Sequence, residues 1–301
     1  MAVQADTTER QNLDPAAWLL PLLTIFIWSG NTIVTKASAG VIEPASISFY
    51  RWLIALILLT PFVAVGLWRN RALGLQHWQK LFVLGMLGMV VYQSIAYEAA
   101  KTTTAINMGL IAALMPLIST LFASAFAAER LTAPRLIGGV LSLVGVAYLI
   151  ARGDPTLLLS GGLHVGDALM LLAVLANSLY GVLLKRWSLP LSMSQQLWWQ
   201  IAFATLLLLP IWLFSNISPI TADNLPLVLY AAIPTSLLAP YCWMLSIRTL
   251  GAARSSVIIN LLPLIVVVLA WAILGERLES FHFVGGGLAL AGVLIGMRQG
   301  R

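Results

Sequence analysis

An internal repeat is the feature that most constrains the fold of this chain, because residues 104–153 recur as residues 251–300 at a constant offset. The aligned positions include Pro116 and Pro263, Glu129-Arg130-Leu131 and Glu276-Arg277-Leu278, Gly138-Gly139 and Gly285-Gly286, and Gly145-Val146 and Gly292-Val293. Each copy combines an apolar segment with a central proline, a short charged turn and a glycine-rich apolar segment. A long internal repeat determines the architecture, so the chain is predicted to be a duplication.

The composition places both copies in a membrane. Hydrophobic residues make up 60% of the 301 residues, and charged residues only 9%. A soluble domain carries about 25% charged residues, so this chain is predicted to be a multi-spanning protein surrounded by the lipid bilayer. The formal net charge of +6 comes from basic residues scattered at the ends of apolar segments. That distribution reflects membrane topology, and it argues against a nucleic-acid partner.

The chain contains ten apolar runs long enough to cross a bilayer, which takes about 20 helical residues. They cover roughly residues 16–37, 45–67, 78–98, 104–127, 132–151, 165–185, 194–214, 225–247, 254–275 and 281–298. If the loops alternate sides, the basic residues of the outer loops are Lys36, Lys101, Arg152 and Arg277, and apart from Arg51 the others fall inside. Basic loops favour the cytoplasmic side, so both termini are predicted inside. The polar residues 1–15 are then a cytosolic tail rather than a signal peptide.

The repeat extends to the front of each half, where Lys36 aligns with Lys185 and Pro61 with Pro210. The predicted repeats therefore span residues 16–151 and 165–298, with five helices in each. An odd number of helices places the second repeat upside down relative to the first. Inverted repeats are typical of secondary transporters that work by alternating access; the alternative is a duplicated but static bundle.

Further residues carry a resemblance to a known family. They are Trp28-Ser29-Gly30, Lys36, Pro44, Arg51, Ala105, Pro116, Glu129-Arg130-Leu131, Gly138 and Gly145-Val146, with the second copies of the repeat. This pattern resembles the drug/metabolite transporter superfamily, and within it the EamA-type exporters, over about residues 16–298. The resemblance implies two five-helix repeats and export of small metabolites across a bacterial inner membrane. The Trp-rich chain looks most like the bacterial aromatic amino acid exporters of that superfamily.

Polar and aromatic residues near the middle of the spans are the candidate substrate ligands. Trp28 and Asn31 share one face of the first span, and Asn177 and Tyr180 share the equivalent face of the sixth. An amide in hydrocarbon needs hydrogen-bond partners, so both Asn residues are expected to face the bundle interior or a water-filled cavity. Hydrogen bonding between helices is the structural alternative.

Two vestibules are predicted from the remaining candidates. Arg51, Tyr92 and Gln93 would line an outer vestibule, and Trp199 and Tyr241 an inner one. Arg51 lies about two turns into the second span, where it either attracts a substrate carboxylate or snorkels outward. For the Tyr and Trp residues the alternative is an aromatic belt at headgroup level. A cavity of aromatics with few charges suits a bulky, mostly apolar solute.

Prolines and glycines inside the spans are candidate hinges, because a proline removes one helical hydrogen bond and permits a kink. The predicted hinge residues are Gly85, Gly88, Pro116, Pro234, Pro240 and Pro263. Kinks that are fixed and only improve packing are the alternative. The glycines of residues 138–145 and 285–296 are predicted to let the fifth and tenth spans pack closely. Their other use would be a contact in a homo-oligomer.

Other kinds of chemistry find little support. Glu98 and Asp167 are the carboxylates nearest to membrane depth, and both are expected to reach interfacial water, so no proton or sodium relay is evident. No zinc motif or serine-nucleophile elbow occurs, so an enzyme, a metal site and a cofactor are not predicted. The favoured function is export of small metabolites, with aromatic or neutral amino acids first. The alternatives are a transporter of anionic solutes, such as nucleotide-sugars or sugar phosphates, and a facilitative channel.

Overall fold

The computed structural model describes residues 18–127, 133–154, 156, 164–250, 255 and 258–296. The described residues form helices with short connections, and no strand occurs among them. Within these ranges, seven helical segments are long and apolar enough to cross a membrane, and three shorter apolar helices cover Ile137–Ile150, Leu262–Leu274 and Ser280–Ile295. The prediction of an all-helical, polytopic membrane protein is confirmed, and the count of ten spans stays a prediction.

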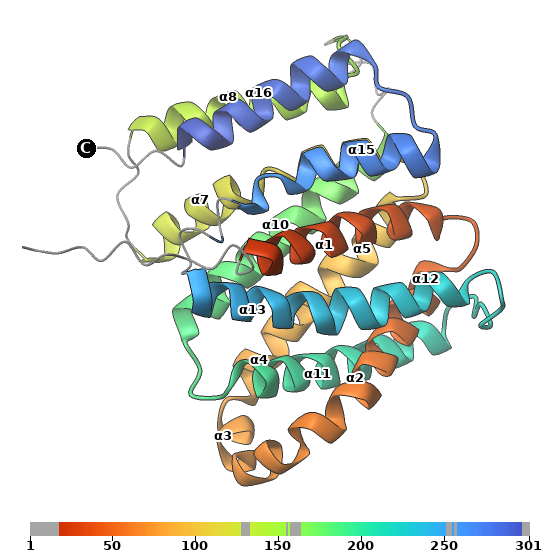
Figure 1. The fold of residues 1–301 in the computed structure, drawn as a ribbon, viewed down its shortest axis with the longest axis vertical. Coiled ribbons are helices and arrows are strands. Elements are labelled where there is room, and N and C mark those ends of the chain that lie inside the picture. The colour runs from red at the N-terminus through yellow and green to blue at the C-terminus, as the bar shows by residue number, and fades with distance from the viewer. Residues whose placement is uncertain are drawn as a thin grey trace, which may run out of the picture.

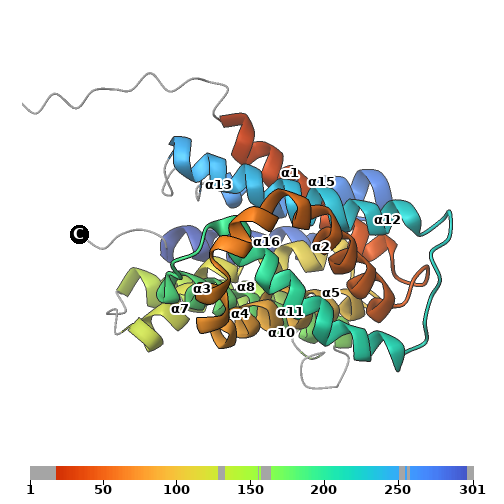
Figure 2. The ribbon, with the colours of Figure 1, turned by 90° about the horizontal axis from the view of Figure 1, so that it is seen from below.

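The helices of the first half are α1 (Leu19–Ala37), α2 (Pro44–Arg69), α3 (Arg71–Gln76), α4 (Trp78–Gly85), η2 (Met86–Val91), α5 (Tyr92–Ala99), α6 (Ala105–Ala112), α7 (Met115–Ala127) and α8 (Ala133–Ile150). Those of the second half are α10 (Val165–Trp187), α11 (Met193–Leu213), α12 (Leu225–Tyr230), η3 (Ala231–Leu238), α13 (Ala239–Leu250), α15 (Leu262–Leu274) and α16 (Ser280–Gly296). The symbol η marks a π-helix, whose hydrogen bonds span five residues instead of four. Most helices run across the view of Figure 1, and Figure 2 looks onto α2, α3, α4 and α11 from below.

Several helix ends follow from local sequence. Pro44 is the first residue of α2, a position where its missing N–H leaves no helical hydrogen bond unmade. Thr104 caps α6, since its Oγ1 accepts a hydrogen bond from the backbone N–H of Asn107 at 3.1 Å. Ser192 and Gln195 form a capping box at the start of α11. These signals fix where the spans begin.

Several contacts that a helix of the first half makes with the second half have an equivalent contact, made by the corresponding helix of the second half with the first. Helix α1 packs against α13 and α15, and its counterpart α10 packs against α5 and α7. In the same way η3 contacts α1 and α2, while η2 contacts α10 and α11. The counterparts α2 and α11 pack against each other, as do α8 and α16. This exchange is the pattern expected of two repeats related by a two-fold axis.

Interruptions of the helices also fall at equivalent positions. The span from Trp78 contains η2 in its middle, and the equivalent span from Leu225 contains η3. A turn at residues 113–114 separates α6 from α7, and a turn at residues 260–261 precedes α15. Pro116 and Pro263 are then the second residues of α7 and α15. Their predicted role as hinges concerns motion and stays a prediction.

The glycine-rich segments bring α8 and α16 into backbone contact at the upper edge of Figure 1. A Cβ atom on Gly145 would lie 2.5 Å from the backbone nitrogen of Ala289, and one on Gly292 would lie 2.5 Å from the carbonyl oxygen of Gly138. In addition, the Ser142 hydroxyl donates to the carbonyl of Ala289 at 2.8 Å. The glycines therefore serve the packing of the fifth helix of each half against the other, as the sequence predicts.

We expect Gly292→Ala to destabilise the folded protein by about 1–3 kcal/mol, because the new methyl group meets backbone atoms that cannot rotate away. Gly287→Ala is the matched control on the same helix, since a Cβ atom there meets nothing within 4 Å. The measurement is thermal unfolding of both variants in detergent. Equal stability of the two variants would contradict the backbone contact between α8 and α16.

Candidate functional site

Arg51 is a buried cation at the junction of three helices. Its side chain is 3% exposed. Its Nε donates to the Ser236 hydroxyl of η3 at 2.8 Å, and its Nη1 donates to the Tyr97 hydroxyl of α5 at 3.3 Å. The guanidinium also lies 4.8 Å from the ring centroid of Trp52. Arg51 therefore points into the protein, and the alternative in which it snorkels outward does not hold.

The charge of Arg51 has neutral partners. Among the described residues, the ion pairs are those of Lys101 with Glu43 and Glu98. A buried charge is costly unless it is paired, and among the described residues no carboxylate pairs with Arg51.

The buried surroundings of Arg51 are polar and partly π-helical. Gln93 is 5% exposed and lies one helical turn before Tyr97 on α5. The Ser236 hydroxyl that accepts from Arg51 donates in turn to the carbonyl of Ala231 at 2.8 Å. Tyr92, half-buried, begins α5 next to η2. π-Helical turns frequently mark functional sites, and η3 presents the Ser236 hydroxyl to Arg51.

Gln200 is the residue of the second half that is equivalent to Arg51, and it is neutral. Gln200 on α11 is 2% exposed. The backbone carbonyl oxygen of Gln200 would lie 2.5 Å from a Cβ atom on Gly85, the last residue of α4 before η2. Arg51 and Gln200 thus each lie beside the π-helical span of the opposite half. The charge occurs on one side only, so the interior is asymmetric.

The candidates of α1 and α10 lie at contacts between helices. Trp28 is half-buried, with its ring centroid 5.8 Å from that of Trp243 on α13. Asn177 donates its amide to the Met115 sulfur at 3.3 Å. A Cβ atom on Gly88 would lie 2.9 Å from the ring of Tyr180, so the glycine of η2 leaves room for that ring.

Asn31 contributes a buried amide oxygen, and no donor to it occurs among the described residues. The amides of Asn31 and Asn177 both face the protein, as the sequence predicts, and Asn177 is held by a helix of the opposite half. Whether any of these residues binds substrate stays a prediction.

Two aromatic candidates lie elsewhere. Tyr241 is the third residue of α13 and is 55% exposed, and its place in an inner vestibule stays a prediction. Trp199 stacks on Phe203 at 5.8 Å between ring centroids, and it fills the space above Gly74 of α3. Trp199 therefore packs α11 against α3 and α4 and makes no contact with Arg51 that the structure records.

The remaining hinge candidates follow the π-helical span of the second half. Pro234 lies inside η3, and Pro240 is the second residue of α13. Proline cannot donate a backbone hydrogen bond, so both residues weaken the regular ladder where η3 passes into α13.

A second polar cluster joins the two halves where helices end in loops. We call it the loop-end cluster, made of Lys36, Thr103, Asn107, Asp167 and Glu276. Thr103 Oγ1 and Asn107 Nδ2 both donate to Asp167 Oδ1, the amide at 3.1 Å. Lys36 Nζ donates to the carbonyls of Ala100 and Thr103 at 2.8 and 2.6 Å. These contacts join α1, α6 and α10.

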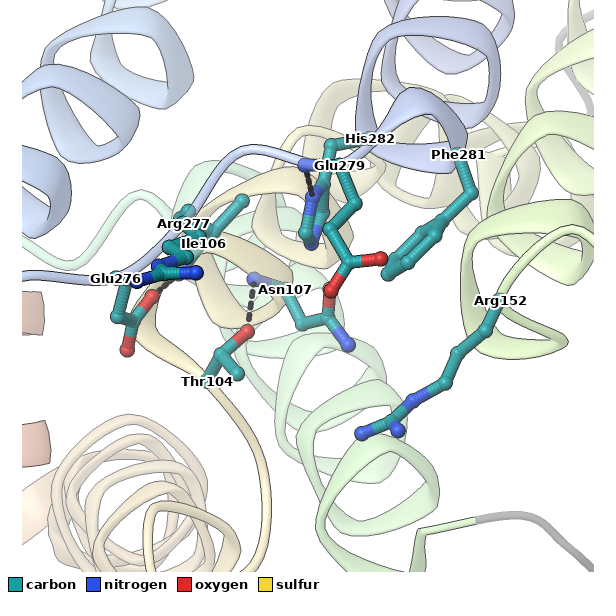
Figure 3. A pocket seen from close by; sticks show the side chains of 9 residues that line it. All are labelled: Thr104, Ile106, Asn107, Arg152, Glu276, Arg277, Glu279, Phe281 and His282. Carbon is teal, nitrogen blue, oxygen red and sulfur yellow. Dashed lines mark hydrogen bonds between the residues drawn. The ribbon is translucent and has the colours of Figure 1, made fainter.

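Glu276 completes the loop-end cluster from the other half. Its two carboxylate oxygens accept hydrogen bonds from the backbone N–H groups of Ala105 and Ile106, at 2.7 and 3.0 Å. Figure 3 shows Glu276 beside the start of α6, with Thr104 below and Glu279 and His282 above. A cavity of about 210 Å³ lies between these groups. Among the described residues, no group of three or more potential metal ligands occurs.

Asp167 departs from the sequence-based expectation. It is 1% exposed, so the prediction that it reaches interfacial water is wrong, because Thr103 and Asn107 cover it. Glu98 is exposed as predicted, and its carboxylate pairs with Lys101 at 3.1 Å. Partial desolvation lowers the pKa of Lys101, but its hydrogen bonds and charge contacts with Glu98 and Glu43 outweigh this, so the net pKa is raised.

Comparison with known proteins gives a family match in both halves. The model of the EamA-like transporter family matches residues 15–151 and 164–297. The uncharacterized transporter YyaM of Bacillus subtilis is 24% identical over 288 residues, which cover 91% of each chain. A probable terminal-alkyne amino-acid exporter of Streptantibioticus cattleyicolor is 25% identical over 94% of this chain and 93% of its own. The aromatic amino acid exporter YddG of Ancylobacter novellus is 28% identical over 45% of this chain and 46% of its own.

Proposed function

Because the chain belongs to the EamA-like transporter family, we propose that it exports small metabolites across a bacterial inner membrane, with aromatic and neutral amino acids as the substrate class. Two similar proteins are named as amino-acid exporters, one for terminal-alkyne amino acids and one for aromatic amino acids. Transport is by alternating access, in which the two halves exchange roles. The substrate is a free small molecule.

The observation that carries this proposal is the buried, unpaired charge of Arg51. A carboxylate of the substrate can pair with the guanidinium, and such charge-assisted hydrogen bonds are stronger than neutral ones. The Tyr97 hydroxyl and the Trp52 ring already contact the same guanidinium. An amino acid with an apolar or aromatic side chain therefore matches one cation in aromatic surroundings.

Phosphorylated solutes fit the described residues less well. A phosphate carries about two negative charges and is best held by several cations. Lys185 and Arg186 are exposed in the last turn of α10, away from the buried position of Arg51. We therefore place nucleotide-sugars and sugar phosphates second.

Purified protein in proteoliposomes tests the substrate class. We expect uptake of labelled Phe to saturate, and we expect unlabelled Trp and Phe to compete at least about tenfold more effectively than Thr, a nucleoside or a phosphosugar. A tenfold difference corresponds to about 1.4 kcal/mol of binding free energy. Empty liposomes are the control. Preferential competition by the phosphosugar would favour the anionic class, and flux that rises linearly without saturation would favour a channel.

A further inference from the structure

Glu276 makes the most direct link between a loop of one half and a helix start of the other. Both carboxylate oxygens accept from successive backbone N–H groups, those of Ala105 and Ile106. The first N–H groups of a helix have no partner within the helix. The Thr104 side chain takes the next of them, that of Asn107. The start of α6 is therefore capped jointly by its own residue and by the opposite repeat.

This contact closes the end of the molecule at which the loop-end cluster lies. Asp167, from the start of α10, binds Thr103 and Asn107 on either side of the same helix start. Gly166 lets α10 approach this loop, since a Cβ atom there would lie 2.4 Å from the carbonyl oxygen of Ala99. Ala105 itself is 0% exposed. Separation of the halves at this end would break the bonds of Glu276 and of Asp167 together.

We propose that Glu276 is a latch that holds this end of the transporter shut, and that its release from α6 accompanies opening of that end. The inference rests on the proposed alternating access. It assigns a role to Glu276, the first residue of the Glu-Arg-Leu motif in the second repeat. In the closed state, the carboxylate is paired with two N–H donors at a helix start, where a negative charge is favourable. In the open state, water satisfies both partners. Sequence topology predicts that this end faces outward.

Thiol accessibility tests the latch independently of any substrate. Cys242 is replaced by Ala, and Ala105→Cys places a single thiol at the buried helix start. The protein is studied in nanodiscs, where a water-soluble maleimide reaches both faces. Parent and variant are compared by their labelling rates. Glu276→Gln keeps the shape of the side chain but removes the charge. We expect labelling about tenfold faster in this variant, since hydrogen bonds to charged groups are among the stronger ones.

Glu279→Gln is the matched control, because it removes the same charge from the same loop while the backbone bond from Glu279 to His282 is kept. It should label at the parent rate. Glu276→Ala should label at least as fast as Glu276→Gln, and hydrogen exchange of α8 and α16 checks that each variant is folded. Parent-like labelling of a folded Glu276→Gln protein would overturn the latch. Loss of saturable transport in the unmodified protein would instead overturn the proposed function and leave the labelling result standing.

Discussion

Arg51→Gln is expected to lower the rate of amino-acid transport at subsaturating substrate by about ten- to a hundredfold. A hydrogen bond to a charged group contributes about 1.5–3 kcal/mol, and this range corresponds to those factors. Glutamine is the residue at the equivalent position of the second half, Gln200, so the fold tolerates it beside a π-helical span. The measurement is the initial rate of Phe uptake in proteoliposomes.

Two further variants separate binding from structure in that experiment. Arg51→Lys keeps the charge but loses the planar donor group, so we expect an intermediate rate. Arg248→Gln removes an exposed cation from the end of α13 and should leave transport unchanged. If Arg51→Gln is folded and transports at the parent rate, the guanidinium does not bind the substrate and serves only to join α2, α5 and η3.

Replacement of both Pro116 and Pro263 by alanine is expected to reduce the maximal transport rate by roughly tenfold, with little change in the substrate concentration at half-maximal rate. Each proline follows a turn that interrupts a helix, at residues 113–114 and 260–261. Alanine is the strongest helix former and restores the missing N–H donor. A continuous helix across the turn would resist bending, and conformational steps often limit turnover.

Pro61 and Pro210 provide a matched control pair. They are equivalent to each other, and each lies inside an uninterrupted helix, α2 or α11. Both are exposed. Pro61→Ala with Pro210→Ala should therefore transport at nearly the parent rate. Equal rates for the two double variants would show that the prolines after the turns are fixed features of packing rather than hinges.

The repeat in the sequence predicts the large-scale organisation well, because it depends on composition and spacing. The alignment of Pro116 with Pro263 anticipates that both helices are interrupted at the same place. The glycines of α8 and α16 likewise predict a close contact that the structure contains. Such features are local or recur at a constant offset, so one chain is sufficient to recognise them.

The faces of residues beyond a π-helical turn are harder to predict. A helical wheel assumes hydrogen bonds that span four residues, whereas η3 inserts turns that span five. Every side chain after such a turn is rotated relative to the expected face. Tyr241 follows η3 by three residues, so a regular helical wheel drawn through η3 does not give the face on which it lies. Ser236 lies within η3, and its hydroxyl accepts a hydrogen bond from Arg51 that no sequence motif indicates.

Contacts between loops and distant helix starts could not be predicted at all. Glu276 binds the N–H groups of Ala105 and Ile106, which are separated from it by most of the second half. Carboxylates at the ends of membrane spans usually lie in water, so the sequence alone predicts water contact for Asp167, which begins α10. The one sequence feature that points to Glu276 is the repetition of the Glu-Arg-Leu motif. A charged turn that recurs in both halves of a membrane protein indicates a structural or functional role for its charges.

The contact between α8 and α16 has a mechanical consequence for the whole molecule. At the lower edge of Figure 1, α2 meets α11 through large side chains such as Trp52 and Ile201. At the upper edge, the backbones of α8 and α16 touch with no such layer between them. Along this side, the two halves are therefore held together by direct backbone contact over the length of α8 and α16. Because sliding of α8 along α16 would bring backbone atoms into collision, we expect the two halves to move least against each other along this side.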